Sequence, residues 1–107
     1  MKEGLYKFES LIELAKSREM SRRGYYLFAN DFDAISPDSD VFVGDIHVVD
    51  DEETIPAAAT LLGMKSFVNS ELLEDVVLNI YEKSKDRSVE FIVRSFRYYV
   101  ENDNFLV

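Results

Sequence analysis

Three segments of the chain carry apolar residues at the spacing of an amphipathic helix, and they restrict the possible fold more than any other feature. The spacing predicts helices over residues 8–19, 71–84 and 88–101. Ser70 is the expected cap of the second helix, and Asp86 or Ser88 is expected to start the third. Because each helix must bury its apolar face against another element, the three helices require a shared core.

Other segments have the β-branched and aromatic composition of strands. These predicted strands are residues 25–29, 41–49 and 66–69. The middle one reads as the central strand, with Phe42 on one face and Val41 and Val43 on the other. The proline that opens residues 56–63 favours a short helix there. This order predicts an α+β fold, with a small, mainly antiparallel sheet of three or more strands packed against three main helices.

Length and composition indicate one folded domain. The 107 residues are 47% hydrophobic and include 8 Phe and 6 Tyr, which is enough for a single core and too much for a disordered chain. We therefore expect one domain over residues 1–107. The absence of cysteine fits a reducing compartment. Glu3, Glu9 and Glu13 interrupt the region where a signal peptide needs apolar residues, and no apolar run is long enough for a membrane span. A cytoplasmic, soluble protein is expected.

The net charge of −9 is concentrated in one segment. Residues 31–53 hold nine of the 21 acids, and the remaining 12 equal the number of Lys and Arg. No Lys or Arg occurs between Gly24 and Met64. A pI near 4.5 disfavours direct nucleic-acid binding, since phosphate contacts need clustered cations. The charge favours a basic protein partner, although net charge also serves solubility.

Two Asp-x-Asp sequences in this segment resemble the start of a calcium-binding loop, but neither continues as one. Such a loop requires Gly at its sixth position and a bidentate Glu at its twelfth. Counted from Asp31, these positions hold Ser36 and Phe42, and the register that starts at Asp38 fails at both positions too. A zinc site is disfavoured by one His and no Cys. We expect no metal and no other cofactor.

Asp45 and His47 form the main candidate for acid–base catalysis. Two positions apart on a predicted strand, they share a face, where the carboxylate could orient the imidazole and raise its pKa. The alternative is a packed or solvent-facing histidine with no catalytic role. No nucleophile motif and no glycine-rich phosphate loop accompany the pair. The sequence therefore predicts a protein that is not an enzyme.

A recognition surface for a basic protein requires only what the acidic segment offers. Crowded like charges repel one another, and a docking cationic surface relieves that repulsion. Phe32 and Phe42 lie among the acids, either as apolar anchors for a partner or as core residues. The predicted partner-binding residues are Asp31, Phe32, Asp33, Asp38, Asp40, Asp45, Asp50, Asp51, Glu52 and Glu53.

The chain carries, in this order, "LIELAKS", "YYLFANDFDAISPDSDVFVGD", "VDDEETIPAAATLLGM", "FVNSELLEDVVLNIYEKS" and "FRYYVENDNFL". In this layout, over nearly its whole length, it resembles small bacterial immunity proteins of contact-dependent growth inhibition systems. The resemblance implies a cytoplasmic antidote that binds the toxic C-terminal domain of a cognate secreted effector, often an RNase or DNase. The alternative from charge alone is an acidic adaptor or regulatory protein with a different basic partner.

Overall fold

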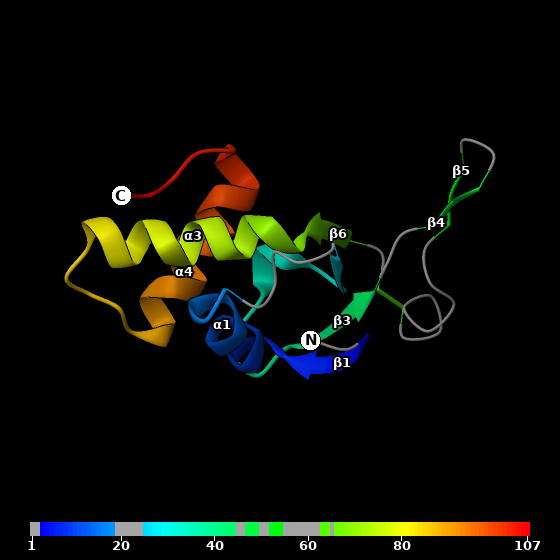
Figure 1. The fold of residues 1–107 in the computed structure, drawn as a ribbon, viewed down its shortest axis with the longest axis horizontal. Helices are drawn as coiled ribbons and strands as arrows, with labels where there is room; N and C mark the ends of the chain where they lie inside the picture. Colours follow the sequence, from blue (N-terminus) through cyan, green and yellow to red (C-terminus); the bar gives the residue numbers. More distant parts are fainter. Residues whose placement is uncertain (1–2, 19–24, 45–46, 50–51, 55–62, 65) are drawn as a thin grey trace.

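The computed structural model describes residues 3–18, 25–44, 47–49, 52–54, 63–64 and 66–107 (Figure 1). Its centre is a four-stranded antiparallel sheet. In spatial order the strands are β1 (Gly4–Lys7), β3 (Asp40–Gly44), β2 (Tyr26–Ala29) and β6 (Ser66–Asn69). The helical elements are α1 (Phe8–Lys16), the 3-10 helix η1 (Phe32–Ala34), α3 (Ser70–Lys83) and α4 (Val89–Asn102). A separate hairpin pairs β4 (His47–Val49) with β5 (Glu52–Thr54).

The three long helices pack on one face of the four-stranded sheet and form the main core with it. Leu27 and Ala29 of β2 and Val41 and Val43 of β3 contribute to this core from the sheet. From the helices, the buried side chains include Phe8, Leu11, Ile12, Leu73, Val76, Val77, Ile80, Ile92 and Phe96. The predicted fold class, an α+β domain with an antiparallel sheet against three main helices, is confirmed.

The opposite face of the sheet carries a second, smaller apolar cluster. Phe28, Phe42 and Met64 are buried in it, and Tyr26 packs against them. Phe67 of β6 adds its ring 5.9 Å from the ring of Phe28. Phe42 and its neighbours Val41 and Val43 thus face opposite sides of the sheet, as the period-2 alternation of a strand predicts.

The helix boundaries differ in detail from those expected. The side chain of Asn69, not Ser70, caps α3 by accepting a hydrogen bond from the Glu71 backbone N–H (2.9 Å). Ser70 is instead the first residue of α3. Ser88 caps α4 as predicted, accepting from the Phe91 N–H at 3.2 Å. The first helix, α1, ends at Lys16, three residues before the predicted end.

Two strand predictions need correction. The chain does not form one strand over residues 41–49: β3 ends at Gly44, and His47–Val49 belong to the separate hairpin (Figure 1). Strand β1 was not expected, yet it forms an edge of the main sheet beside β3. The predicted helix over residues 56–63 lies outside the described residues, apart from Gly63.

Candidate functional site

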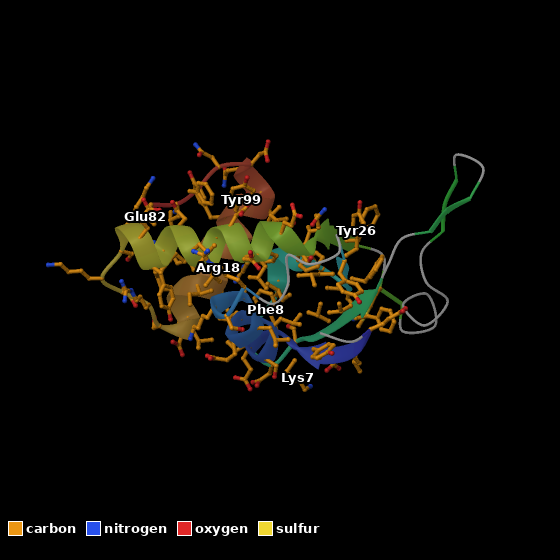
Figure 2. All side chains as sticks on the ribbon, viewed as in Figure 1. Lys7, Phe8, Arg18, Tyr26, Glu82 and Tyr99 are labelled. Atoms are coloured by element: carbon orange, nitrogen blue, oxygen red, sulfur yellow. The ribbon has the colours of Figure 1, made fainter. Side chains whose placement is uncertain are left out.

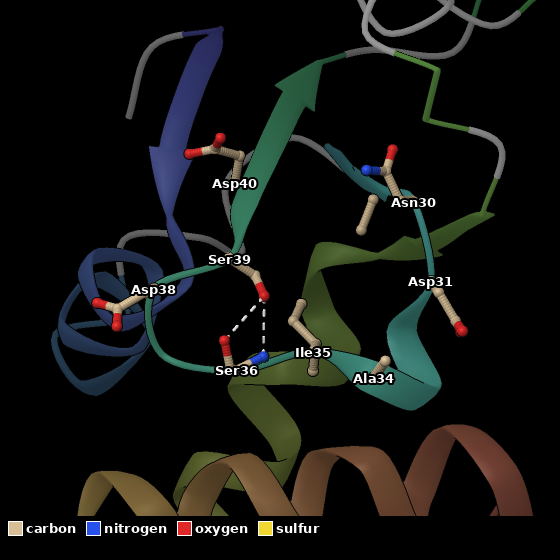
Figure 3. Close-up of a pocket in the computed structure, with 9 residues that line it drawn as sticks. Asn30, Asp31, Ala34, Ile35, Ser36, Asp38, Ser39 and Asp40 are labelled. Atoms are coloured by element: carbon tan, nitrogen blue, oxygen red, sulfur yellow. Dashed lines mark hydrogen bonds between the residues drawn. The ribbon is translucent and has the colours of Figure 1, made fainter.

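The connection between β2 and β3, residues 30–39, is the described part of the acidic segment with the most exposed charge. Asp31, Asp33 and Asp38 are all exposed there. With Asp40 at the start of β3, Asp31 and Asp38 line an open cavity of about 430 Å³, which also has serine and asparagine side chains in its wall. We call this cavity the acidic pocket (Figure 3).

Hydrogen bonds within the connection give it a defined shape. Asp31 caps η1, because its carboxylate accepts a hydrogen bond from the Asp33 backbone N–H at 2.9 Å. The Ser36 backbone N–H donates to the Ser39 hydroxyl at 2.9 Å, and the Ser39 N–H donates to the Ser36 carbonyl at 3.1 Å. These bonds form a turn of the kind that Ser, Pro and Asp favour. The carboxylates are therefore presented from an ordered turn.

Two apolar side chains attach the connection to the core. Ile35 is buried, and Phe32 is only 3% exposed. The ring of Phe32 packs edge-to-face against Phe96 of α4, with 5.8 Å between the ring centroids. Phe32 is therefore a core residue, as the alternative had it, and not an exposed anchor. Its contact with a partner stays a prediction, since Phe32 also lines the cavity beside Phe67. The core alternative also holds for Phe42, which is 7% exposed.

Asp40 forms an ion pair with a lysine of β1, which the sequence pattern did not reveal. Its carboxylate accepts a hydrogen bond from the Lys7 Nζ at 2.7 Å, and the two residues lie opposite each other on β3 and β1. This hydrogen bond and the negative charge of Asp40 raise the pKa of Lys7. Figure 2 shows Lys7 at the rim of the molecule beside β1. The acidic segment itself contains no Lys or Arg, but the charge of Asp40 is compensated by Lys7 from outside the segment.

Asp33 has a mixed environment. It lines a shallow cavity of about 300 Å³ together with Arg94 and Arg97 of α4, although neither arginine reaches ion-pair distance of it. Asp31 and Asp33 also line a third cavity, beside Phe67 of β6. The acidic connection therefore borders two surfaces, the acidic pocket on one side and the β6 side of the sheet on the other.

The remaining predicted partner-binding residues fall in the hairpin region. Asp45, Asp50 and Asp51 lie outside the described residues. Glu52 and Glu53 belong to β5, whose backbone pairs with β4. The proposed pair of Asp45 with His47 also includes a residue outside the described part of the chain.

The described carboxylates are not arranged as a metal site. Figure 3 shows Asp31, Asp38 and Asp40 pointing in different directions from the connection. Over the described ranges, no group of three or more acidic or histidine side chains could hold a metal ion. A separated arrangement of this kind suits contacts with several cations of a protein surface better than the coordination of one ion.

The comparison with known families covers almost the whole chain. A family described as a domain of unknown function, DUF7716, matches residues 8–107. The chain belongs to the DUF7716 family. All the predicted partner-binding residues lie within the DUF7716 range, whereas β1 with Lys7 precedes it. No curated protein and no solved structure matches the chain significantly. In the part of the chain that the structure describes, no helix has the length and apolar character needed to cross a membrane.

Proposed function

We propose that this DUF7716 protein is an immunity protein that works by binding, without catalysis. It binds and blocks the basic C-terminal toxin domain, a nuclease, of a contact-dependent inhibition effector in the cytoplasm. The observation that carries the proposal is the set of exposed carboxylates of Asp31, Asp33 and Asp38 on an ordered connection. None of the three forms an ion pair with another described residue.

The electrostatics of this surface favour a cationic partner. Uncompensated carboxylates within a few residues repel one another, and the approach of a basic surface relieves that repulsion. Such complementarity accelerates association and selects against acidic partners. Because the turn is already ordered by its own hydrogen bonds, little conformational entropy is lost on binding.

A nuclease fits the chemistry of the surface. Enzymes that cleave RNA or DNA hold phosphates with Lys and Arg, so their active sites are cationic. A protein with concentrated carboxylates can occupy that cationic surface and exclude the nucleic acid. The resemblance to immunity proteins supports the same conclusion from an independent direction.

The test uses two charge variants. Asp31→Asn with Asp38→Asn removes two charges, and the asparagine at position 31 keeps a side-chain oxygen for the η1 cap. Asp75→Asn with Glu82→Gln is the matched control, because both acids are exposed on α3. The probe is the toxin domain encoded beside this protein, purified in an inactive form. We measure its association rate at low and high salt, and the survival of cells that express the active toxin.

The first variant should associate about tenfold more slowly at low salt, and the control should match the wild type. Wild-type protein that neither binds the toxin domain nor protects cells would overturn the proposal. Binding of a basic protein that is not toxic would instead support an acidic adaptor.

A further inference from the structure

Among the described residues, no strand pairs with the outer edge of β6, which we call the free edge and which has backbone groups available for another strand. The Ser70 N–H donates to the Tyr25 carbonyl at 2.8 Å, which continues the β2–β6 ladder by one pair. Since hydrogen-bonded pairs alternate in an antiparallel ladder, Leu27–Val68 is the next bonded pair. The pair that follows, Phe28–Phe67, is a non-hydrogen-bonded pair. The backbone N–H and C=O of Phe67 therefore point away from β2.

The side chains of β6 do not protect this edge. Natural sheets usually guard an exposed edge with a charge, a proline or a bulge. The four residues of β6, Ser66–Asn69, include no charged residue and no proline. The ring of Phe67 is 37% exposed, so part of it is accessible to a partner.

A groove lies against this edge. It has a volume of about 370 Å³ and is lined by Phe67 and Val68 of β6, by Val100 of α4, and by Asp31 and Asp33 of the acidic connection. An apolar wall and carboxylates thus meet in one groove, beside backbone groups of Phe67 that pair with no described strand. Recognition by strand addition uses this combination, in which the backbone gives affinity and the neighbouring pockets select side chains.

The charge of the groove indicates what occupies it. Asp31 and Asp33 favour a segment with Lys or Arg at the position beside them. A second copy of this chain is disfavoured, because two chains of net charge −9 repel each other. The occupant that fits is an extended, basic segment of the partner.

We propose that the free edge of β6 is the docking site for an extended, basic segment of the toxin domain, which adds as a fifth strand. This inference rests on the proposed function and specifies where the partner binds. An apolar side chain of the segment packs against Phe67, and a cationic side chain lies beside Asp31 and Asp33. The segment's backbone bonds to the N–H and C=O of Phe67.

The sheet offers a matched control on its other edge. The Phe8 N–H donates to the Ser39 carbonyl at 2.9 Å, so Phe8–Ser39 is a hydrogen-bonded pair that continues the β1–β3 ladder. Because hydrogen-bonded and non-hydrogen-bonded pairs alternate, Leu5–Phe42 is non-hydrogen-bonded, and the Leu5 N–H points away from β3. Leu5 is 51% exposed. Proline at either position removes an outward donor and no ladder bond, which is the tolerated placement of proline on an edge strand. Phe67→Pro and Leu5→Pro therefore differ mainly in which edge they block.

The experiment measures dissociation of each full-length variant from the inactive toxin domain, with thermal unfolding as the check on folding. Phe67→Pro should dissociate about tenfold faster or more, as expected for the loss of a central apolar contact and a backbone bond. Leu5→Pro should dissociate at the wild-type rate. Phe67→Thr, which keeps the N–H and removes the ring, should lie between them.

Hydrogen exchange tests the same site without a substitution. The amide of Phe67 should exchange more slowly in the complex than in the free protein, whereas that of Leu5 should not change. Suppose that the toxin domain binds wild-type protein and that the Asp31/Asp38 variant binds it more weakly. If Phe67→Pro nevertheless binds normally and the Phe67 amide gains no protection, the proposed docking site is wrong and the proposed function stands. If wild-type protein does not bind the toxin domain at all, both proposals fail. A homodimer through β6 in solution would also overturn this assignment.

Discussion

The two edges of the main sheet are built differently. On β1, Lys7 lies at the edge and its ammonium group forms an ion pair with Asp40 of the neighbouring strand. Each of the two strands has one exposed large apolar side chain, Leu5 on β1 and Phe67 on β6, but no residue of β6 carries a charge. In Figure 2, the labelled Lys7 marks the β1 side of the sheet, and the labelled Tyr26 marks the side near β6. Charged edges resist pairing with another chain, so the difference indicates that β6 is the edge available to a partner.

The acidic connection accounts for part of this difference, because it joins the two sides of the sheet. Asp40, which follows the connection as the first residue of β3, belongs to the β1 side, where Lys7 compensates its charge. Asp31 and Asp33 at its start border the β6 groove, where no ion pair with a described residue compensates them. One continuous acidic segment thus contributes a neutralised pair to one edge and free negative charge to the other. Charge counted along the sequence does not reveal this division.

The largest expected effect comes from detaching the connection from the core. Phe32→Ala removes a 3%-exposed ring that packs on Phe96, and truncations of this kind lower the free energy of unfolding by about 3–5 kcal/mol. Chemical denaturation measures this loss. In protein that is still folded, hydrogen exchange should accelerate in residues 31–39 and leave the amides of β1 unchanged. Equal acceleration at both edges would show that the connection does not shape the β6 side selectively.

Much of the fold follows from local patterns, but the edges do not. The stripes that include Val76, Ile80, Ile92 and Phe96 predicted the helices, since apolar residues at a 3.6-residue period form one face of a helix. Strand β1 has four residues and leads directly into α1, so no turn residue marks it. The break of the predicted central strand after Gly44 depends on which strands pair, and pairing is not encoded in the alternation itself.

The candidate site was predictable only in part. The exposed acids Asp31, Asp33 and Asp38 followed from composition and turn chemistry. The ion pair of Lys7 with Asp40 joins residues 33 positions apart, and only the register of β1 on β3 brings them together. The β6 groove likewise combines residues from η1, β6 and α4, which no local pattern links. Neither the ion pair nor the groove can be recognised from the sequence of the acidic segment alone.

A smaller effect is expected at Gly44, on the side of the sheet away from the helices. A Cβ added there would lie 2.9 Å from the Phe42 ring and 3.0 Å from the Glu3 carboxylate. Glu3 can move aside, but the Phe42 ring is buried, so Gly44→Ala should lower the free energy of unfolding by about 1–3 kcal/mol. Thermal and chemical denaturation report the change. Because Phe42 lies between Leu5 of β1 and Phe28 of β2, and the Phe28 ring is 5.9 Å from that of Phe67, a shift of the Phe42 ring would reach the β6 side as well. Unchanged stability would show that the Phe42 ring has room to shift.

The smallest effect concerns the ion pair that distinguishes β1 from β6. Lys7 and Asp40 lie opposite each other in a non-hydrogen-bonded pair of the ladder, where side chains approach closely. The hydrogen bond to Asp40 raises the pKa of Lys7 above 10.5. A raised pKa in the folded state means that the pair stabilises the fold below pH 10.5 and that this contribution is lost as pH rises through the raised value. Exposed pairs contribute little, so the change is small.

Comparison of wild type with Lys7→Met isolates this contribution from the other lysines, including Lys16, whose pKa is also raised by its hydrogen bond to Glu13. The difference in unfolding free energy between the two proteins should be constant between about pH 7 and pH 10.5 and should shrink above pH 10.5. Asp40→Asn should abolish the same difference, and the double variant should behave like either single variant. A difference that does not vary across this pH range would mean that the pair is not formed in solution. Lys7 would still place a charge on the β1 edge, and the asymmetry of the two edges would rest on that single charge and on the β6 groove with its two aspartates.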